Sequence, residues 1–212
     1  MANSEISLRE RKSAKLKLLI LSTAKTELQK SNFQDLHVTN LCEKVGISKV
    51  TFFRYFPQKE DLLLYFLRVW SFEISMELLS NETKGIKAVK YIFDRYGDLC
   101  ENYSSVILHL IKYHAVSPTV LKPISIKKAE KHLLFPNHEG VQHMEVLAFD
   151  KLLEKYILEA IFQTEITKSS NVSDMVSMLL TTTYGSILVA KMKQIPVKGM
   201  LKKNINSVLE TF

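Results

Sequence analysis

The sequence predicts an all-α protein, with a small three-helix head at the N-terminus and a larger helical body after it. Apolar residues recur at helical spacing along most of the chain. Residues that break helices are scarce, since the 212 residues include six glycines and five prolines. With 46% hydrophobic and 24% charged residues, the chain has the composition of a folded soluble protein rather than of a disordered one.

The first helix is expected to begin after Ser7. Ser7 and Glu10 have the spacing of a capping box, in which each side chain accepts a backbone N–H of the other residue. The apolar residues that follow at helical spacing are Leu16, Leu19, Ile20, Thr23 and Leu28. A signal peptide is not predicted here, because the apolar run is short and Lys25 soon interrupts it.

Two short helices joined by a glycine turn are predicted within residues 33–62. Gly46 can adopt the left-handed conformation that ends a helix, and Ser48 is a good N-cap for the next one. Phe52 and Phe56 would then face inward, leaving a small polar and basic surface outside. This arrangement describes a helix-turn-helix, a unit that reads DNA.

The same segment resembles the DNA-binding domain of the tetracycline-repressor (TetR) family of bacterial transcription regulators. The matching positions are Phe33, Val38, Leu41, Gly46, Ile47, Ser48, Phe52, Tyr55, Phe56, Lys59 and Leu62. The resemblance covers the first quarter of the chain and implies a C-terminal helical domain for ligand binding and dimerisation. The departures from the family pattern are His37 for a capping threonine, Cys42 and Val45 for alanines, Val50 for a glycine and Phe53 for a tyrosine.

The residues predicted to contact DNA are Ser48, Lys49, Val50, Thr51, Phe53, Arg54, Tyr55 and Lys59. Lys49 and Arg54 suit guanine edges or phosphates, and Val50 suits a thymine methyl group. Lys59 stands at a predicted helix N-terminus, where a cation opposes the helix dipole unless an anion such as phosphate is near. Taken singly, Lys49 and Arg54 are equally compatible with solvated charges, and Tyr55 with simple packing.

The net charge of +7 is unevenly distributed. Residues 1–70 contain 12 Lys and Arg against 7 Asp and Glu, giving +5, whereas the remaining 142 residues contain 17 against 15, giving +2. A basic head on a nearly neutral body is typical of a protein that binds a polyanion through its head.

The body is predicted to be a series of helices. The expected ranges are 59–80, about 85–102, 104–116, a broken helix plus loop within 118–140, two long helices at about 139–165 and 171–194, and a short helix after Pro196. No uncharged stretch approaches the length of a transmembrane helix. The predicted domains are a DNA-binding domain at residues 1–58 and an effector-binding and dimerisation domain at residues 59–212.

The last two long helices are broadly apolar, which exceeds what one buried face needs. In TetR-like proteins the final helix pair forms a four-helix bundle with a second subunit, so the resemblance implies a homodimer. The residues predicted at this interface are Phe149, Leu153, Tyr156, Leu180, Thr183 and Ile187. The alternative is burial of these residues inside one thick domain.

The resemblance also implies an effector pocket between the helices at 85–102 and 104–116. The candidates for effector contact are Tyr96, Cys100, Tyr103, His109 and Tyr113. Aromatic and polar tips of this kind suit a mainly apolar organic ligand, although each residue alone is as compatible with plain core packing.

An enzyme is not expected. His109 and His114, like His138 and His143, are five residues apart, about 140° around a helix, and so do not share a face as a zinc-binding pair does. No cofactor and no metal are predicted, and Cys42 does not suggest a disulfide framework with Cys100.

The sequence therefore predicts a cytoplasmic, ligand-responsive regulator, most often a repressor in this family. It would bind a palindromic double-stranded DNA operator and be released by a small organic effector. The alternative is an activator or a ligand-independent DNA-binding regulator of the same fold.

Overall fold

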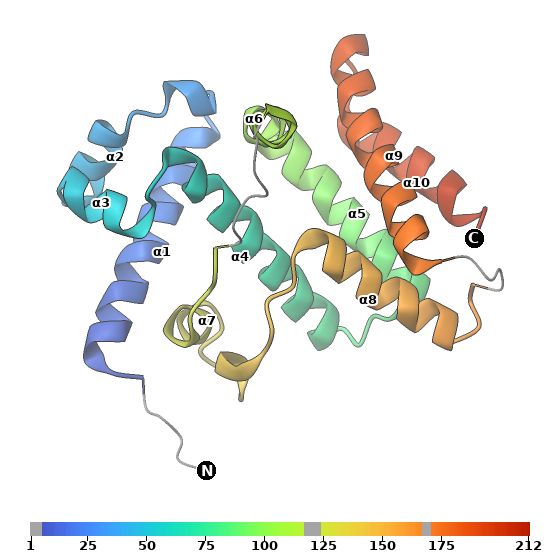
Figure 1. Cartoon of the computed structure of the whole chain (residues 1–212), viewed down its shortest axis with the longest axis horizontal. Coiled ribbons are helices and arrows are strands. Elements are labelled where there is room, and N and C mark those ends of the chain that lie inside the picture. Colours follow the sequence, from blue (N-terminus) through green and yellow to red (C-terminus); the bar gives the residue numbers. More distant parts are fainter. Residues whose placement is uncertain (1–5, 117–123, 167–170) are drawn as a thin grey trace. The chain divides into compact units, whose positions relative to one another are not determined.

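The computed structural model describes residues 6–116, 124–166 and 171–212, and within these ranges every regular element is a helix (Figure 1). The elements are α1 (Leu8–Leu28), η1 (Phe33–Asp35), α2 (Val38–Val45), α3 (Lys49–Tyr55), α4 (Lys59–Ser80), α5 (Gly85–Asn102), α6 (Ser104–Val116), α7 (Lys128–Leu134), η2 (Val141–His143), α8 (Phe149–Phe162), α9 (Val172–Lys193) and α10 (Val197–Leu209). The predicted all-α fold is confirmed.

By packing, the chain forms two compact units. Unit 1 comprises residues 1–69 and 112–146, and unit 2 comprises residues 70–111 and 147–212. Helices α4 and α6 therefore contribute residues to both units. The packing boundary falls inside α4 rather than between residues 58 and 59, where the sequence analysis divides the chain by function.

Helix α1 begins at the predicted capping box. Ser7 Oγ accepts a hydrogen bond from the Glu10 N–H at 3.2 Å, and the Glu10 carboxylate accepts one from the Ser7 N–H at 2.9 Å. The buried face of α1 differs from the predicted apolar stripe, because Leu19 is 48% exposed while Lys17 is only 6% exposed. Ile20 and the other buried residues of α1 share their side of the helix with this lysine.

Lys17 belongs to a buried polar cluster in unit 1, which we call the Lys17–Glu130–Tyr65 cluster. The Lys17 ammonium lies 3.3 Å from a carboxylate oxygen of Glu130, and the Tyr65 hydroxyl donates to the same oxygen at 2.8 Å. The ammonium also lies 3.9 Å from the centroid of the Tyr65 ring. Burial lowers the pKa of Lys17, opposed by the charge of Glu130, and burial raises the pKa of Tyr65. One ion pair thus joins α1, α4 and α7.

Unit 2 is arranged around α5, on which α8 and α10 pack, while α9 packs on α8 and α10 (Figure 1). Tyr96 of α5 stacks on Phe149 of α8 with ring centroids 4.7 Å apart, and Trp70 meets Tyr96 edge-on at 5.6 Å. Gly97 allows α10 to approach α5 closely, because a Cβ at this position would lie 2.8 Å from the Lys198 side chain.

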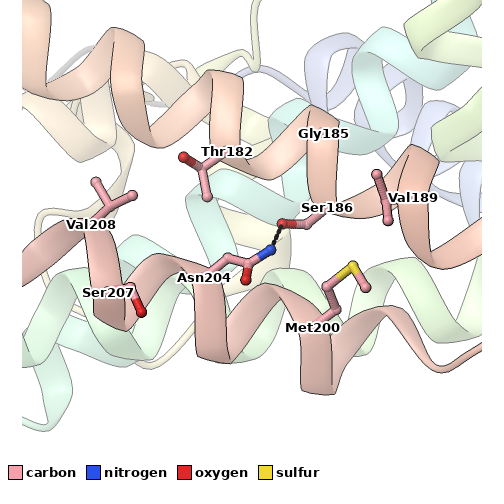
Figure 2. Close-up of a pocket in the computed structure, with 8 residues that line it drawn as sticks. All are labelled: Thr182, Gly185, Ser186, Val189, Met200, Asn204, Ser207 and Val208. Atoms are coloured by element: carbon pink, nitrogen blue, oxygen red, sulfur yellow. Dashed lines mark hydrogen bonds between the residues drawn. The ribbon is translucent and has the colours of Figure 1, made fainter.

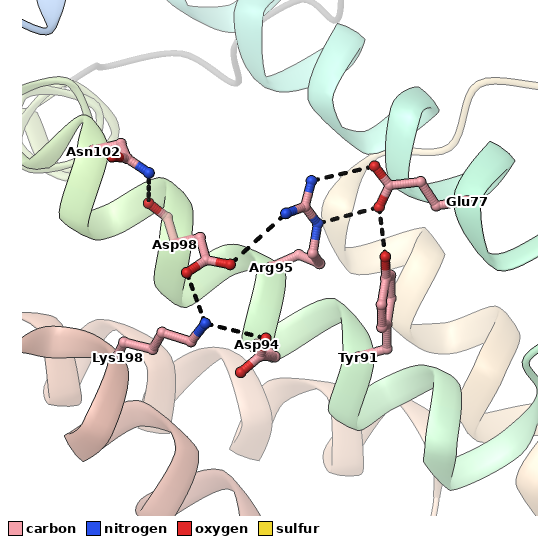
Figure 3. Close-up of polar contacts among 7 residues, drawn as sticks. All are labelled: Glu77, Tyr91, Asp94, Arg95, Asp98, Asn102 and Lys198. Atoms are coloured by element: carbon pink, nitrogen blue, oxygen red, sulfur yellow. Dashed lines mark hydrogen bonds and ion pairs between the residues drawn. The ribbon is translucent and has the colours of Figure 1, made fainter.

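A partly exposed polar network ties α4, α5 and α10 together (Figure 3). The Arg95 guanidinium donates to both carboxylate oxygens of Glu77 at 3.2 Å, and the Tyr91 hydroxyl donates to Glu77 at 2.8 Å. On the other side of α5, Lys198 lies 2.7 Å from Asp98. Partly exposed pairs of this kind stabilise by about 1 kcal/mol or less, so their main effect is to fix the register of the three helices.

The single long helix predicted over residues 139–165 is wrong at its N-terminal end. Gly140 has a left-handed φ of 74°, η2 follows, and α8 begins only at Phe149. Val141 is fully buried and belongs to unit 1, whereas α8 belongs to unit 2. The apolar residues before Phe149 therefore serve a different core from those after it. In the broken segment before them, α7 is the helix, and Pro118 and Pro123 lie outside the described residues.

Of the described helices, one is apolar and long enough to cross a membrane by length and composition, contrary to the sequence expectation. This helix is α9, with a mean hydropathy of 1.3 in its most apolar window, of which 33% is buried. Its ends match the prediction, with Asn171 as N-cap and Gln194 as C-cap. Core helices of soluble proteins meet the same criterion, so it is weak evidence for a membrane span.

Candidate nucleic-acid interface

The turn between α2 and α3 has the geometry predicted from the sequence. Gly46 adopts φ 75° and ψ 39°, and the Ile47 N–H donates to the carbonyl of Cys42 at 2.9 Å. Ser48 Oγ accepts from the Thr51 N–H at 3.1 Å and so caps α3. Phe52 is fully buried, which anchors α3 to unit 1. The helix-turn-helix is therefore confirmed.

The outward face of α3 combines basic and apolar side chains. Lys49 and Arg54 are exposed, Val50 is 81% exposed, and Phe53 is 43% exposed. Thr51 is half-buried, and its hydroxyl lies 3.0 Å from that of Ser48. Exposed apolar side chains of this size are unfavourable in water and favour a surface that contacts thymine methyl groups or sugars.

Tyr55, at the end of α3, is half-buried against α1. The Ser13 hydroxyl donates to the Tyr55 hydroxyl at 3.1 Å, and the Arg54 guanidinium lies 5.5 Å from the centroid of the Tyr55 ring. Sequence reasoning did not find Ser13, because it lies 42 residues before Tyr55 in the chain. The contact places the first turns of α1 beside the C-terminal end of α3.

Lys59 opens α4 and folds back over the loop that contains η1. Its ammonium donates to the Gln34 carbonyl at 3.3 Å and lies 4.4 Å from the centroid of the Phe33 ring. Burial lowers the pKa of Lys59, while the charges of Glu60 and Asp35 oppose that shift. The lysine is thus held at the helix N-terminus rather than freely extended.

The predicted effector residues do not all lie in one unit. Tyr96 and Cys100 are buried in unit 2, where Tyr103 ends α5 and is 9% exposed, and His109 of α6 is half-buried. Tyr113 lies in unit 1, where its hydroxyl donates to the Gln58 side chain at 2.9 Å. The structure therefore brings the first four together in unit 2 but not the fifth.

Two pockets lie in unit 2. The first has a volume of about 470 Å³ and is lined by Cys100, Glu101, Ser104, Ala190, Lys191, Gln194, Ile195 and Val197. The second, of about 410 Å³, is a groove between α9 and α10, where Asn204 donates to the Ser186 hydroxyl at 2.9 Å (Figure 2). Burial raises the pKa of the Cys100 thiol to about 12, so this group is neutral at physiological pH.

Most of the residues predicted at the dimer interface are buried within unit 2. Leu153 and Thr183 are fully buried, and Tyr156 and Ile187 are 5% and 3% exposed. Phe149 packs against Tyr96, and Leu180 is half-buried. In this structure a second subunit has no access to the four buried side chains.

Other apolar residues of the same two helices are exposed instead, and together we call them the apolar α8–α9 face. Its members are Leu158, Phe162, Met178, Tyr184, Leu188, Val189 and Met192, which range from 39% to 88% exposed. Met178, Gly185 and Met192 follow one another at intervals of seven residues and therefore share one side of α9. Sequence reasoning missed this face because both sides of α9 are apolar.

Among the described residues, no three His, Cys, Asp or Glu side chains gather where they would hold a metal ion. Cys42 and Cys100 are both buried, free thiols.

Comparison with known proteins supports the assignment of the head. Residues 20–66 match the family model described as bacterial regulatory proteins of the tetR family. No curated protein sequence matches the chain.

Solved structures resemble the whole chain. FadR of Thermus thermophilus, described as a TetR-family transcriptional repressor in complex with lauroyl-CoA, aligns with a TM-score of 0.60 at 18% identity and covers 92% of this chain and 93% of its own. FadR of Bacillus subtilis, a transcriptional regulator in complex with stearoyl-CoA, aligns with a TM-score of 0.56 at 15% identity, covering 91% and 95%. Residues 20–66 are thus a DNA-binding domain of the tetR family, carried on a chain with the fold of TetR-family transcription regulators.

Proposed function

We propose that this protein is a homodimeric transcription repressor that binds a palindromic DNA operator and releases it when a small organic effector binds to unit 2. The observation that carries the proposal is the outward face of α3. Lys49 and Arg54 stand there beside exposed Val50 on a helix whose N-terminus is fixed by Gly46 and Ser48. A short, rigid, basic helix of this kind fits the major groove.

The side chains of this face would divide into those that read bases and those that position the domain. Lys49 and Thr51 lie in the first turn of α3, which enters a groove most deeply in helix-turn-helix proteins. Tyr55 and Lys59 lie at the following helix ends, where contacts to phosphates hold the domain in register. Loss of the first pair should alter sequence preference, whereas loss of the second should weaken binding to every sequence.

The homodimer would form through the apolar α8–α9 face. Phe162 is 88% exposed and Met192 is 82% exposed, so the protomer leaves large apolar side chains in water. A second copy of the same face would bury them around a two-fold axis, as isologous dimers do. Two α3 helices related by that axis would meet half-sites about one helical turn apart, or 34–36 Å, on one side of the DNA.

The effector is proposed to enter the pocket beside Cys100. A volume of about 470 Å³ is within the range of pockets that hold small organic ligands. The neutral thiol of Cys100 and the side chains of Ile195 and Val197 favour an apolar ligand. The two FadR structures contain acyl-CoA molecules. Lauroyl-CoA is therefore a reasonable first compound to test, with the free fatty acid beside it.

Selection of bound sites from random double-stranded DNA tests the DNA-binding part of the proposal. The expected outcome is a palindrome whose preferred bases change in Lys49→Ala but not in Lys59→Ala, which should lose affinity alike for all sequences. Binding without any sequence preference would contradict the proposal.

Release by the effector is tested on the selected operator. A compound that binds unit 2 should lower operator affinity and raise the melting temperature of the free protein, because it binds the folded state. Repression requires that transcription from an operator-bearing promoter in the cytoplasm rises when the chain is absent. A fall in transcription would instead identify an activator.

A further inference from the structure

Basic residues of α1 lie close to the recognition helix. The hydrogen bond of 3.1 Å between Ser13 and Tyr55 places the first turns of α1 next to the C-terminal end of α3. Arg9 lies four residues, about one helical turn, before Ser13 and so on the same side of α1. Lys12 precedes Ser13 directly, and both basic side chains are exposed.

Two lysines from a distant part of the sequence join this region. Lys127 is the N-cap residue of α7 and Lys128 is its first residue, and both are exposed. Both lie near Glu10 of α1, since the hydrogen bonds from Ser7 and then the charges of these two lysines lower the pKa of Glu10. Their position depends on the packing of α7 against α1 in unit 1.

The buried Lys17–Glu130–Tyr65 cluster explains why α7 is held there. Glu130 is the third residue of α7, and its carboxylate is fixed by groups from α1 and α4 at 3.3 and 2.8 Å. A buried ion pair tolerates little displacement, because separation would leave two unpaired charges in the core. The exposed lysines that precede Glu130 are therefore presented on a firm support beside α1.

We infer that Arg9, Lys12, Lys127 and Lys128 form a flanking basic strip that contacts DNA phosphates outside the base pairs read by α3. The inference rests on the proposed function and extends its DNA interface to a segment beyond the helix-turn-helix. The strip joins the exposed Arg54 at the end of α3 through the Ser13–Tyr55 contact, so the positive charge is continuous with the outward face of α3. Because the DNA backbone continues past any half-site, its phosphates are available to such a strip.

The inference has a measurable consequence in flank length and in salt dependence. Each phosphate neutralised on B-DNA contributes about 0.9 to the slope of log affinity against log salt. Two lost contacts in a protomer therefore lower that slope by roughly 1.8. Base preference stays the same, because phosphate contacts carry no sequence information.

The experiment compares two duplexes of the selected operator, one ending at its outermost specified base pair and one extended by about ten base pairs, one helical turn, on each side. The proteins are the wild type, Arg9→Gln/Lys12→Gln and Lys127→Gln/Lys128→Gln. The matched control is Lys202→Gln/Lys203→Gln, which removes two exposed lysines of α10 in unit 2. Circular dichroism and melting temperature verify that each variant is folded.

The extended duplex is expected to bind wild type and control at least about tenfold more tightly than the short one at low salt. The two strip variants should lose this gain and show the reduced salt slope, while selecting the same palindrome. An equal flank gain and an unchanged slope in both folded strip variants would overturn the inference while leaving the proposed function intact. Failure of the wild type to bind any selected site would overturn the proposed function itself.

Discussion

Removal of one partner from the Lys17–Glu130–Tyr65 cluster should destabilise unit 1 far more than loss of a surface ion pair. At 3.3 Å, two unit charges attract by roughly 5 kcal/mol at an effective dielectric constant of 20. Burial of both ions costs several kcal/mol each, so the pair contributes little net stability. In Lys17→Met, however, the Glu130 carboxylate loses its cation and keeps the hydrogen bond from Tyr65.

The expected loss is about 3–5 kcal/mol in the free energy of unfolding for Lys17→Met, and a similar loss for Glu130→Leu. The double variant Lys17→Met/Glu130→Leu should be more stable than either single variant, because no unpaired charge remains in the core. Tyr65→Phe should cost about 1.5–3 kcal/mol, the value of a hydrogen bond to a charged group.

Urea unfolding followed by circular dichroism measures these losses, and hydrogen exchange of amides in α1 and α7 assigns them to unit 1. The matched control is Lys44→Met, which breaks an ion pair of 2.7 Å with Glu27 on the surface, where the lysine side chain is 50% exposed. This change should cost no more than about 1 kcal/mol. Equal losses for Lys17→Met and Lys44→Met, or exact additivity in the double variant, would refute the assignment of a buried, coupled pair.

Three further outcomes follow from the structure. Stability should rise with pH between the lowered pKa of Lys17 and its ordinary value of 10.5, because the unfolded chain binds more protons there, and a titration of urea midpoints should lose this rise in Lys17→Met. Gly46→Ala should cost about 1–2 kcal/mol from the left-handed φ of 75°, with no clash since nothing lies within 4 Å, and thermal melting measures it. Leu188→Glu should give a folded monomer by light scattering, whereas Thr183→Glu, at a fully buried position, should unfold unit 2.

The local structure of the head could be predicted because its causes lie within a few residues of one another. The capping box at Ser7, the left-handed turn at Gly46 and the cap at Ser48 each depend on backbone groups no more than five positions away. The same holds for the outward face of α3, which follows once Phe52 is recognised as the buried residue. The predicted DNA contacts rest on this local geometry and stay predictions.

Features that depend on distant segments were not predictable in the same way. Lys17 is buried because Glu130, 113 residues later, supplies a counter-charge, and nothing near Lys17 in the sequence indicates this. Tyr113 and Tyr96 both carry aromatic rings with polar tips on successive helices, yet they belong to different units. A helical spacing identifies the sides of a helix but not the partner of each side.

Helix α9 illustrates this limit and also what its apolar composition means. Thr183 and Leu188 are both compatible with a core position by sequence, but Thr183 is fully buried and Leu188 is 45% exposed. The polar residue is inside because its hydroxyl donates to the Leu179 carbonyl at 2.6 Å, which satisfies it without a partner from another helix. One apolar side of α9 therefore suffices for unit 2, and the other side remains in water. An apolar surface of this kind is costly for a monomer. The excess apolar content that suggested dimerisation from the sequence is thus present, but on residues other than those first selected.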